Sequence, residues 1–161
     1  MSEIKKIAND KDSVLVFDVD GVLAVLEFGE HNHYMLDDEG RYHANISWKN
    51  FYNKEKVSKK MQEFLSKKDM WRVYVITKAA SEQEFGHKKY FLSENYNIRV
   101  ENVYWVRKET EKKEKLQEIK SFYKDLPDYK LVMIDDSVTI LSDVMDNTGF
   151  STMHISSFLD V

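Results

Sequence analysis

The chain has 161 residues, of which 42% are hydrophobic and 32% are charged, and its formal net charge is −4. This length favours one domain, and the composition is typical of a folded globular protein rather than a disordered one. The chain contains no cysteine, which excludes disulfide scaffolds, thiol catalysis and cysteine-based zinc sites. The negative net charge argues against a protein whose main task is to bind nucleic acid.

The sequence carries no sign of a membrane span or an export signal. No stretch approaches the ~18 consecutive apolar residues that a transmembrane helix needs. Residues 1–12 are polar and lack the apolar centre of a signal peptide. We therefore expect a cytoplasmic protein without a membrane partner.

Short apolar runs predict the strands of a buried sheet. Four are continuous, at residues 14–17, 73–76, 103–106 and 131–134, and a weaker one covers residues 150–155. Continuous rather than alternating apolar residues are typical of parallel strands covered on both faces.

Helical patterns lie between these runs. Apolar residues spaced along one helix face predict helices near residues 54–68 and around Phe85/Leu92/Tyr96, Leu116/Ile119/Tyr123 and Val138/Leu141/Val144/Met145. The second of these helices opens at Ser81-Glu82-Gln83-Glu84, a capping-box sequence. Strands alternating with helices predict an α/β protein, a three-layer α/β/α Rossmann-like fold with a mainly parallel sheet of about five strands. Because no repeat or linker interrupts the pattern, we expect one domain over residues 1–161.

Residues 24–48 break this alternation. They carry no helical stripe, and two half-apolar runs at 34–36 and 42–46 flank Asp37-Asp38-Glu39-Gly40. A short acidic segment that ends with a glycine, between two such runs, predicts a β-hairpin turn. We therefore expect a hairpin flap inserted between the first strand and its crossover helix.

Carboxylates follow two of the predicted strands directly. Asp18 and Asp20 follow the first strand, and Asp135 and Asp136 end the fourth. Ligands of open α/β sheets bind outside the carboxyl ends of the strands, where these side chains would converge. Two like charges ~4 Å apart repel by about 4 kcal/mol at an effective dielectric constant of ~20. A cation among them would relieve this repulsion, and oxygen ligands favour Mg²⁺.

The sequence Phe17-Asp18-Val19-Asp20-Gly21-Val22-Leu23 resembles the first motif of the haloacid dehalogenase superfamily of phosphohydrolases. Thr77, at the end of the second strand, matches the second motif. The pair Asp135-Asp136 matches the fourth motif. The resemblance spans nearly the whole chain, and its first and fourth motifs are the specific ones.

The third motif of that superfamily is a lysine upstream of the acidic pair, and several residues here fit it. The candidates are Lys108, Lys112, Lys113 and Lys115. We favour Lys112, because it shares the inward stripe of Leu116 and Ile119. Lys108 stays an alternative, since the pattern Val106-Arg107-Lys108 resembles some nucleotidase-like members.

The resemblance implies a Mg²⁺-dependent phosphatase. Asp18 would be the nucleophile that forms an aspartyl-phosphate, and Asp20 would be the general acid and base. Thr77 and Lys112 would hold phosphoryl oxygens. Metal ligands would come from Asp18, the Asp20 backbone, Asp136 and Asp135. Substrate contacts are further expected from Gly21, whose flexibility lets the backbone turn after the strand, and from Lys78 and Lys108.

The sequence leaves the substrate open among phosphate monoesters. Residues 86–92 resemble a stretch of pyrimidine 5′(3′)-deoxyribonucleotidases, which makes a nucleotide one candidate, and the acidic pair also occurs in polynucleotide 3′-phosphatases. The flap residues that would contact a base or instead pack on the core are His31, His33, Tyr34, Tyr42, His43 and Trp48. A run of lysines, Lys54, Lys56, Lys59, Lys60, Lys67 and Lys68, fits a solvated helix face better than a nucleic-acid interface.

Two hypotheses from other classes compete with the phosphatase. A response-regulator receiver has a similar layout, but its acidic pair follows the first strand, its phosphoacceptor the third and its lysine the fifth. Here the third strand ends in Val106-Arg107-Lys108 and the last in Ser156-Ser157. The second hypothesis is a non-catalytic member of the haloacid dehalogenase type that serves in binding or signalling.

Overall fold

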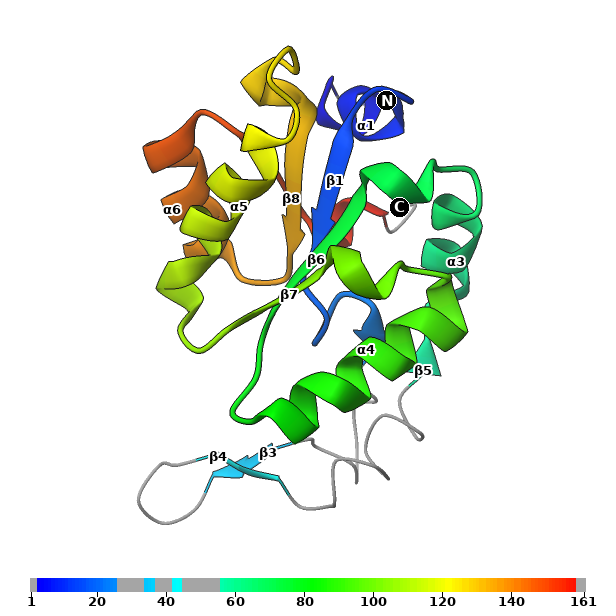
Figure 1. The fold of residues 1–161 in the computed structure, drawn as a ribbon, viewed down its shortest axis with the longest axis vertical. Helices are drawn as coiled ribbons and strands as arrows, with labels where there is room; N and C mark the ends of the chain where they lie inside the picture. The colour runs from blue at the N-terminus through cyan, green and yellow to red at the C-terminus, as the bar shows by residue number, and fades with distance from the viewer. Residues whose placement is uncertain (1–2, 26–33, 37–41, 45–55, 159–161) are drawn as a thin grey trace.

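The computed structural model describes residues 3–25, 34–36, 42–44 and 56–158 (Figure 1). The predicted hairpin turn at 37–40 and the side chains of the flap histidines and aromatics lie outside the described residues. The same holds for Lys54 and for the side chain of Lys56.

A five-stranded, all-parallel sheet forms the centre of the fold. Its order is β7 (Val103–Val106), β6 (Val73–Lys78), β1 (Val14–Phe17), β8 (Leu131–Asp135) and β9 (Ser151–His154). These strands confirm all five predicted runs, including the weak one at 150–155, and the fold is a three-layer α/β Rossmann-like fold.

The strand order distinguishes between two kinds of α/β sheet. Numbered along the chain, the five strands lie in the order 3-2-1-4-5. This is the doubly wound dinucleotide-binding order, whereas flavodoxin-like sheets, receivers included, have the order 2-1-3-4-5. The order reverses between β1 and β8, so these neighbouring strands flank the topological switch point where ligands of such sheets bind.

Helices cover both faces of the sheet (Figure 1). The α-helices are α1 (Glu3–Asn9), α3 (Lys59–Leu65), α4 (Glu82–Tyr96), α5 (Lys112–Ser121) and α6 (Val138–Thr148). Short 3₁₀ helices are η1 (Met70–Arg72), η2 (Val100–Asn102), η3 (Glu109–Glu111), η4 (Asp128–Lys130) and η5 (Ile155–Phe158). Alternate residues of β1 point to opposite faces, so that Leu15 packs with α1, α3 and α4, and Val16 packs with α5 and α6.

The helix predicted near residues 54–68 is shorter than its stripe suggested. Ser58 ends the preceding strand segment and caps α3, since its side chain accepts a hydrogen bond from the Met61 amide at 3.3 Å. Lys56 and Val57 instead form β5, which pairs antiparallel with β2 (Ala24–Val25). The prediction of a helix at 56–58 is therefore wrong, because a tertiary strand pair overrides the local pattern.

The stripe predicted on α6 is correct only in its centre. Leu141 and Val144 are buried, whereas Val138 and Met145 are 66% and 56% exposed. The two exposed residues lie seven positions apart, on one line at the solvent edge of the helix. Helix α6 therefore meets the sheet with a narrower apolar face than the sequence indicated.

The flap contains an antiparallel strand pair. Strand β3 (Tyr34–Leu36) pairs with β4 (Tyr42–Ala44), with Tyr34 opposite Ala44 and Leu36 opposite Tyr42. This register confirms the two strands of the predicted hairpin. Among the residues that the structure describes, no helix has both the length and the apolar character to cross a membrane.

Tyr96 fixes the base of the insertion to α4. Its buried hydroxyl donates a hydrogen bond to the Leu23 carbonyl at 2.6 Å and accepts one from the Ser58 amide at 3.0 Å. Burial raises the pKa of Tyr96 to about 12, so the hydroxyl keeps its proton at neutral pH. Leu23 directly precedes β2 and Ser58 directly follows β5, so one side chain holds both ends of the inserted segment.

Replacing Tyr96 with phenylalanine should therefore destabilise the fold. The Tyr96→Phe variant leaves the buried Leu23 carbonyl without its donor, and we expect a loss of ~1–3 kcal/mol in the free energy of unfolding. Urea denaturation measures this loss. Tyr90→Phe is the matched control, because Tyr90 lies on the same helix but is 62% exposed. Equal stability of the two variants would contradict the role given to the Tyr96 hydroxyl.

Candidate active site

A tight turn after β1 presents the first two carboxylates. The Val19 carbonyl accepts hydrogen bonds from the amides of Leu23 and Ala24, each at 2.9 Å. The Gly21 amide donates to the Ala24 carbonyl at 3.0 Å. These bonds fold the chain back immediately after Asp18, so Asp18 and Asp20 stay at the carboxyl edge of the sheet.

Gly21 is required by the close approach of Asp136. Its φ of +78° is one that other residues rarely adopt. A Cβ atom at this position would lie 2.3 Å from the Asp136 Oδ2 atom and 2.8 Å from Asp136 Cγ. Residue 21 was predicted as a substrate contact; in the structure its lack of a side chain makes room for the acidic loop.

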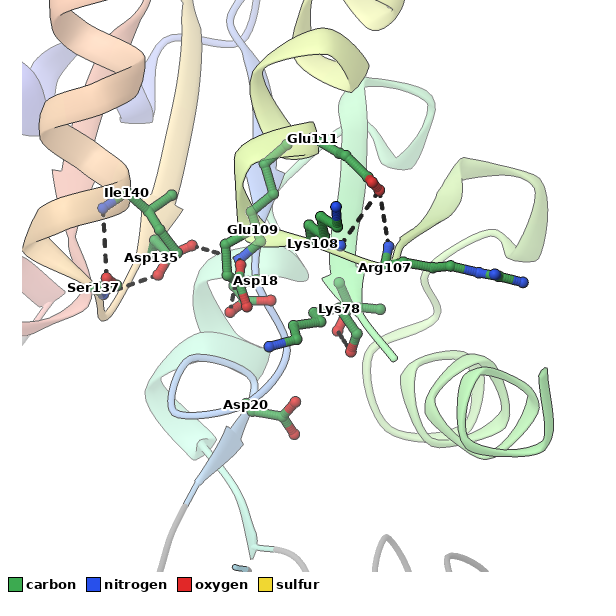
Figure 2. Close-up of polar contacts among 12 residues, drawn as sticks. Asp18, Asp20, Lys78, Arg107, Lys108, Glu109, Glu111, Asp135, Ser137 and Ile140 are labelled. Carbon is green, nitrogen blue, oxygen red and sulfur yellow. Dashed lines mark hydrogen bonds and ion pairs between the residues drawn. The ribbon is translucent and has the colours of Figure 1, made fainter. Parts of the chain in front are cut away.

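Three carboxylates gather at the switch point between β1 and β8. Asp18, Asp135 and Asp136 each offer one oxygen, and these oxygens lie within 4.8 Å of one another. Figure 2 shows Asp18 close to Asp135 and Glu109, with Asp20 set apart below them. The sequence predicted this convergence from two segments far apart in the chain, but it also placed the Asp20 side chain in the cluster, which the structure does not. Oxygen donors in this number fit a hard divalent cation such as Mg²⁺.

The acidic loop after β8 is held in place by its neighbours. Asp135 Oδ1 accepts a hydrogen bond from the Ser137 amide at 2.9 Å, and Ser137 in turn caps α6. His154, at the end of β9, places its Nε2 atom 2.9 Å from the Asp136 carbonyl oxygen and its Nδ1 atom 2.7 Å from Ser156 Oγ. As the carbonyl can only accept, His154 Nε2 carries the proton in this contact.

Lys112 is the lysine that reaches this cluster. Its side chain is 1% exposed, and its Nζ atom lies 3.1 Å from Asp18 Oδ2 and 2.9 Å from Asp135 Oδ2. Glu109 Oε2, at 2.9 Å, is its third and most exposed partner. The inward stripe of α5 thus places Lys112 as the sequence predicted. Burial lowers the pKa of Lys112, but the carboxylates of Asp18 and Asp135 outweigh it and raise the pKa above its ordinary value.

The other lysine candidates lie elsewhere. Lys108 and Lys78 are exposed, and the contacts at these two positions come from the backbone: the Lys108 amide donates to Glu111 Oε2 at 3.4 Å, and the Lys78 carbonyl is an acceptor. Lys113 lies 3.4 Å from Asp143, and Lys115 lies 2.6 Å from Glu118. The structure therefore brings Lys112 alone of the four third-motif candidates to Asp18.

The electrostatics of the cluster favour a proton or a cation on it. Burial raises the pKa of Asp18 to about 7; Lys112 opposes this shift, and Asp135 and Asp20 add to it. Burial and the Asp135 carboxylate likewise raise the pKa of Asp136. One buried ammonium does not neutralise these groups fully, which is the condition under which carboxylates hold a metal ion.

A second buried lysine, Lys88 of α4, was not predicted. Its Nζ atom lies 2.6 Å from Asp20 Oδ2, 3.1 Å from Glu84 Oε1 and 3.1 Å from Thr77 Oγ1. Burial lowers the pKa of Lys88, but Asp20 and Glu84 raise it above its ordinary value. Two signals in the sequence could have found it. Lys88 stands four residues after Glu84 and four before Leu92, on the buried line of the helix.

A concavity in the described part of the protein lies away from these groups. A cavity of about 430 Å³ is lined by residues including Asp12, Arg72 and Lys130, which precede β1, β6 and β8. These positions are at the amino ends of the strands. The carboxylate cluster is thus identified by its chemistry and its place at the switch point rather than by a cavity.

No protein-family model matches the chain, and no curated protein matches it. The functional hypothesis rests on the motifs and on the geometry of the site.

The two glycines at 21 and 86 should respond in opposite ways to alanine. Gly21→Ala places a Cβ against Asp136 and costs at least ~1–2 kcal/mol for the left-handed backbone alone. Gly86→Ala should stabilise by ~0.5–1 kcal/mol, because Gly86 lies inside α4 and its added Cβ meets nothing within 4 Å. Urea unfolding of both variants measures the difference. A Gly21→Ala variant as stable as the wild type would contradict the close approach to Asp136.

Asp18 should make the metal-free protein less stable as the pH rises. Its folded pKa of about 7 lies above the ordinary 3.8, so the folded state binds a proton that the unfolded state has released. The stability from this proton is complete below about pH 4 and is lost as the pH rises through about 7.

In EDTA, the Asp18→Asn variant should therefore gain stability relative to the wild type between about pH 4 and about pH 8. Urea denaturation at both pH values measures the gain. Asp146→Asn is the control, since Asp146 is exposed on α6. A pH-independent difference for Asp18→Asn would contradict the raised pKa.

Proposed function

We propose that this protein is a Mg²⁺-dependent phosphatase that hydrolyses a phosphate monoester through an aspartyl-phosphate intermediate. The observation that carries the proposal is the convergence of Asp18, Asp135 and Asp136 with the buried Lys112 at the switch point of the sheet. A sheet of order 3-2-1-4-5 with this cluster does not have the layout of a receiver domain.

Asp18 is the nucleophile in this proposal. One of its oxygens attacks phosphorus and the bond to the leaving oxygen breaks, which transfers the phosphoryl group to the carboxylate. The Lys112 ammonium, 3.1 Å from Asp18 Oδ2, holds the attacking carboxylate in place and favours its ionised form. Among the partners of Lys112, Glu109 has the most exposed side chain, at 38%, and a phosphoryl oxygen would replace its carboxylate on the ammonium.

Asp20 is the general acid and base. It protonates the departing oxygen and then takes a proton from the water that hydrolyses the aspartyl-phosphate. The turn around Gly21 sets Asp20 apart from the carboxylates of the metal cluster (Figure 2). Two neighbouring carboxylates thus occupy different surroundings, which suits a nucleophile and a proton carrier with different tasks.

The metal ligands would be Asp18, Asp136, Asp135 and the Asp20 backbone carbonyl. A bound Mg²⁺ would neutralise charge on the phosphate that otherwise repels Asp18. Thr77, buried at the end of β6, supplies a hydroxyl for another phosphoryl oxygen. A nucleotide remains one candidate substrate, with a polynucleotide 3′-phosphate as the alternative. We also propose a cytoplasmic location.

Phosphate release from p-nitrophenyl phosphate, with Mg²⁺ and with EDTA, tests the proposal. The wild type should release phosphate only with Mg²⁺, and Asp18→Asn should abolish the release, because an amide cannot act as the nucleophile. Thr77→Val should cost less, about 10²-fold, since it removes one hydrogen-bond donor. The Asp146→Asn variant should keep full activity, as Asp146 is exposed on α6.

Several results would refute the assignment. Substantial turnover by Asp18→Asn would exclude Asp18 as the nucleophile. Absence of turnover by the wild type across nucleotides, sugar phosphates and 3′-phosphorylated oligonucleotides would favour a non-catalytic binding or signalling module.

A further inference from the structure

We infer that Lys88 is a positioning residue that holds Asp20 and Thr77 in their working orientations. This inference rests on the proposed phosphatase function and adds a residue outside the four motifs of the resemblance. Lys88 lies on α4, which packs on one face of the sheet, whereas Lys112 lies on α5 on the other face. The site is therefore held by one buried lysine from each helical layer.

The contacts of Lys88 join two parts of the site that are far apart in the sequence. Its ammonium lies 2.6 Å from Asp20 Oδ2, in the turn after β1, and 2.5 Å from the Lys78 carbonyl, at the end of β6. A purely structural lysine on α4 would be satisfied by Glu84, one helical turn earlier at 3.1 Å. Instead the same ammonium also contacts Asp20, in the turn after β1, and the Lys78 carbonyl, at the end of β6.

The contact with Thr77 determines how its hydroxyl is used. An ammonium can only donate, so the Thr77 Oγ1 atom is the acceptor in its 3.1 Å contact with Lys88. The hydroxyl proton of Thr77 must then point elsewhere. It has a long contact of 3.3 Å to the Lys78 carbonyl, which Lys88 already contacts at 2.5 Å. The Thr77 hydroxyl donates this long hydrogen bond, and a phosphoryl oxygen would replace the Lys78 carbonyl as its acceptor.

The contact with Asp20 fixes where the proton is delivered. The Asp20 side chain is 29% exposed, so it has access to the solvent and to a leaving group. The buried Lys88 ammonium holds one of the Asp20 oxygens, Oδ2, at 2.6 Å. With Oδ2 held by the Lys88 ammonium, the orientation of the Asp20 carboxylate toward the departing oxygen is set. Without Lys88, Asp20 would lose this contact and would face the like charge of Glu84 with no ammonium between the two carboxylates.

The Lys88→Met variant tests this inference, because it removes the ammonium at nearly constant side-chain length. Phenyl phosphate and p-nitrophenyl phosphate have closely similar shapes, but the phenyl ester has the poorer leaving group and depends more on proton donation. We expect kcat/KM to fall at least about ten-fold more for phenyl phosphate than for p-nitrophenyl phosphate. Equal losses for both esters, or no loss, would overturn the inference.

Two further variants separate positioning from folding. Lys89→Met changes the neighbouring lysine of the same helix, whose ammonium lies over the Phe85 ring, and it should leave both kcat/KM values unchanged. Lys88→Met leaves the buried Glu84 carboxylate without its ammonium partner. If this variant does not fold, the double variant Glu84→Gln/Lys88→Met removes that charge as well. The same difference between the two esters is expected from that double variant.

A structural measurement decides the inference without turnover. In crystal structures of the wild type and the Lys88 variant, the Asp20 carboxylate should leave its wild-type position when the ammonium is absent. An Asp20 carboxylate that stays in place would overturn the inference. If the wild type hydrolyses no ester but Asp20 moves in the variant, the proposed function fails and the positioning role of Lys88 stands.

Discussion

The repulsion among carboxylates at one rim of the sheet is the constraint on which the site depends. Asp18, Asp135 and Asp136 cannot all be ionised this close together without a compensating charge. Lys112 supplies part of that charge from a position where water is excluded, so its attraction to Asp18 and Asp135 is little screened. The remaining imbalance favours a bound proton or cation at this rim.

Much of the candidate site could be predicted because parallel strands place their carboxyl ends at the same edge. Asp18 and Asp135 follow continuous apolar runs, and this pattern can be recognised in the sequence without knowing the strand order. Lys112 was also predictable, since the helical stripe of Leu116 and Ile119 extends to it. Periodicity and strand ends are local signals, and for Asp18, Asp135 and Lys112 the positions derived from them agree with the structure.

The parts that were not predicted depend on contacts between distant segments. Lys88 stands on a buried helix line, but beside Glu84 it looks like one half of a surface ion pair until Asp20 is placed next to it. Strands β2 and β5 are each two residues long, which is too short for a periodic pattern in the sequence. Because β5 pairs with β2, residues 56 and 57 form a strand where a helix was expected, and α3 begins only at Lys59. Val138 was predicted to be buried but is exposed. An apolar residue at the edge of a helix has the same spacing as a buried residue of the apolar stripe, so the sequence pattern does not distinguish the two.

The pairing of β2 with β5, held by the Tyr96 hydroxyl, has an implication for how this scaffold can change. The chain enters and leaves the inserted segment at this one junction, between the turn that follows β1 and the start of α3. The entropic cost of closing such a loop grows only slowly with its length. A change in the length of the inserted segment should therefore cost the fold little, while the junction keeps Asp18 and Asp20 at the edge of the sheet.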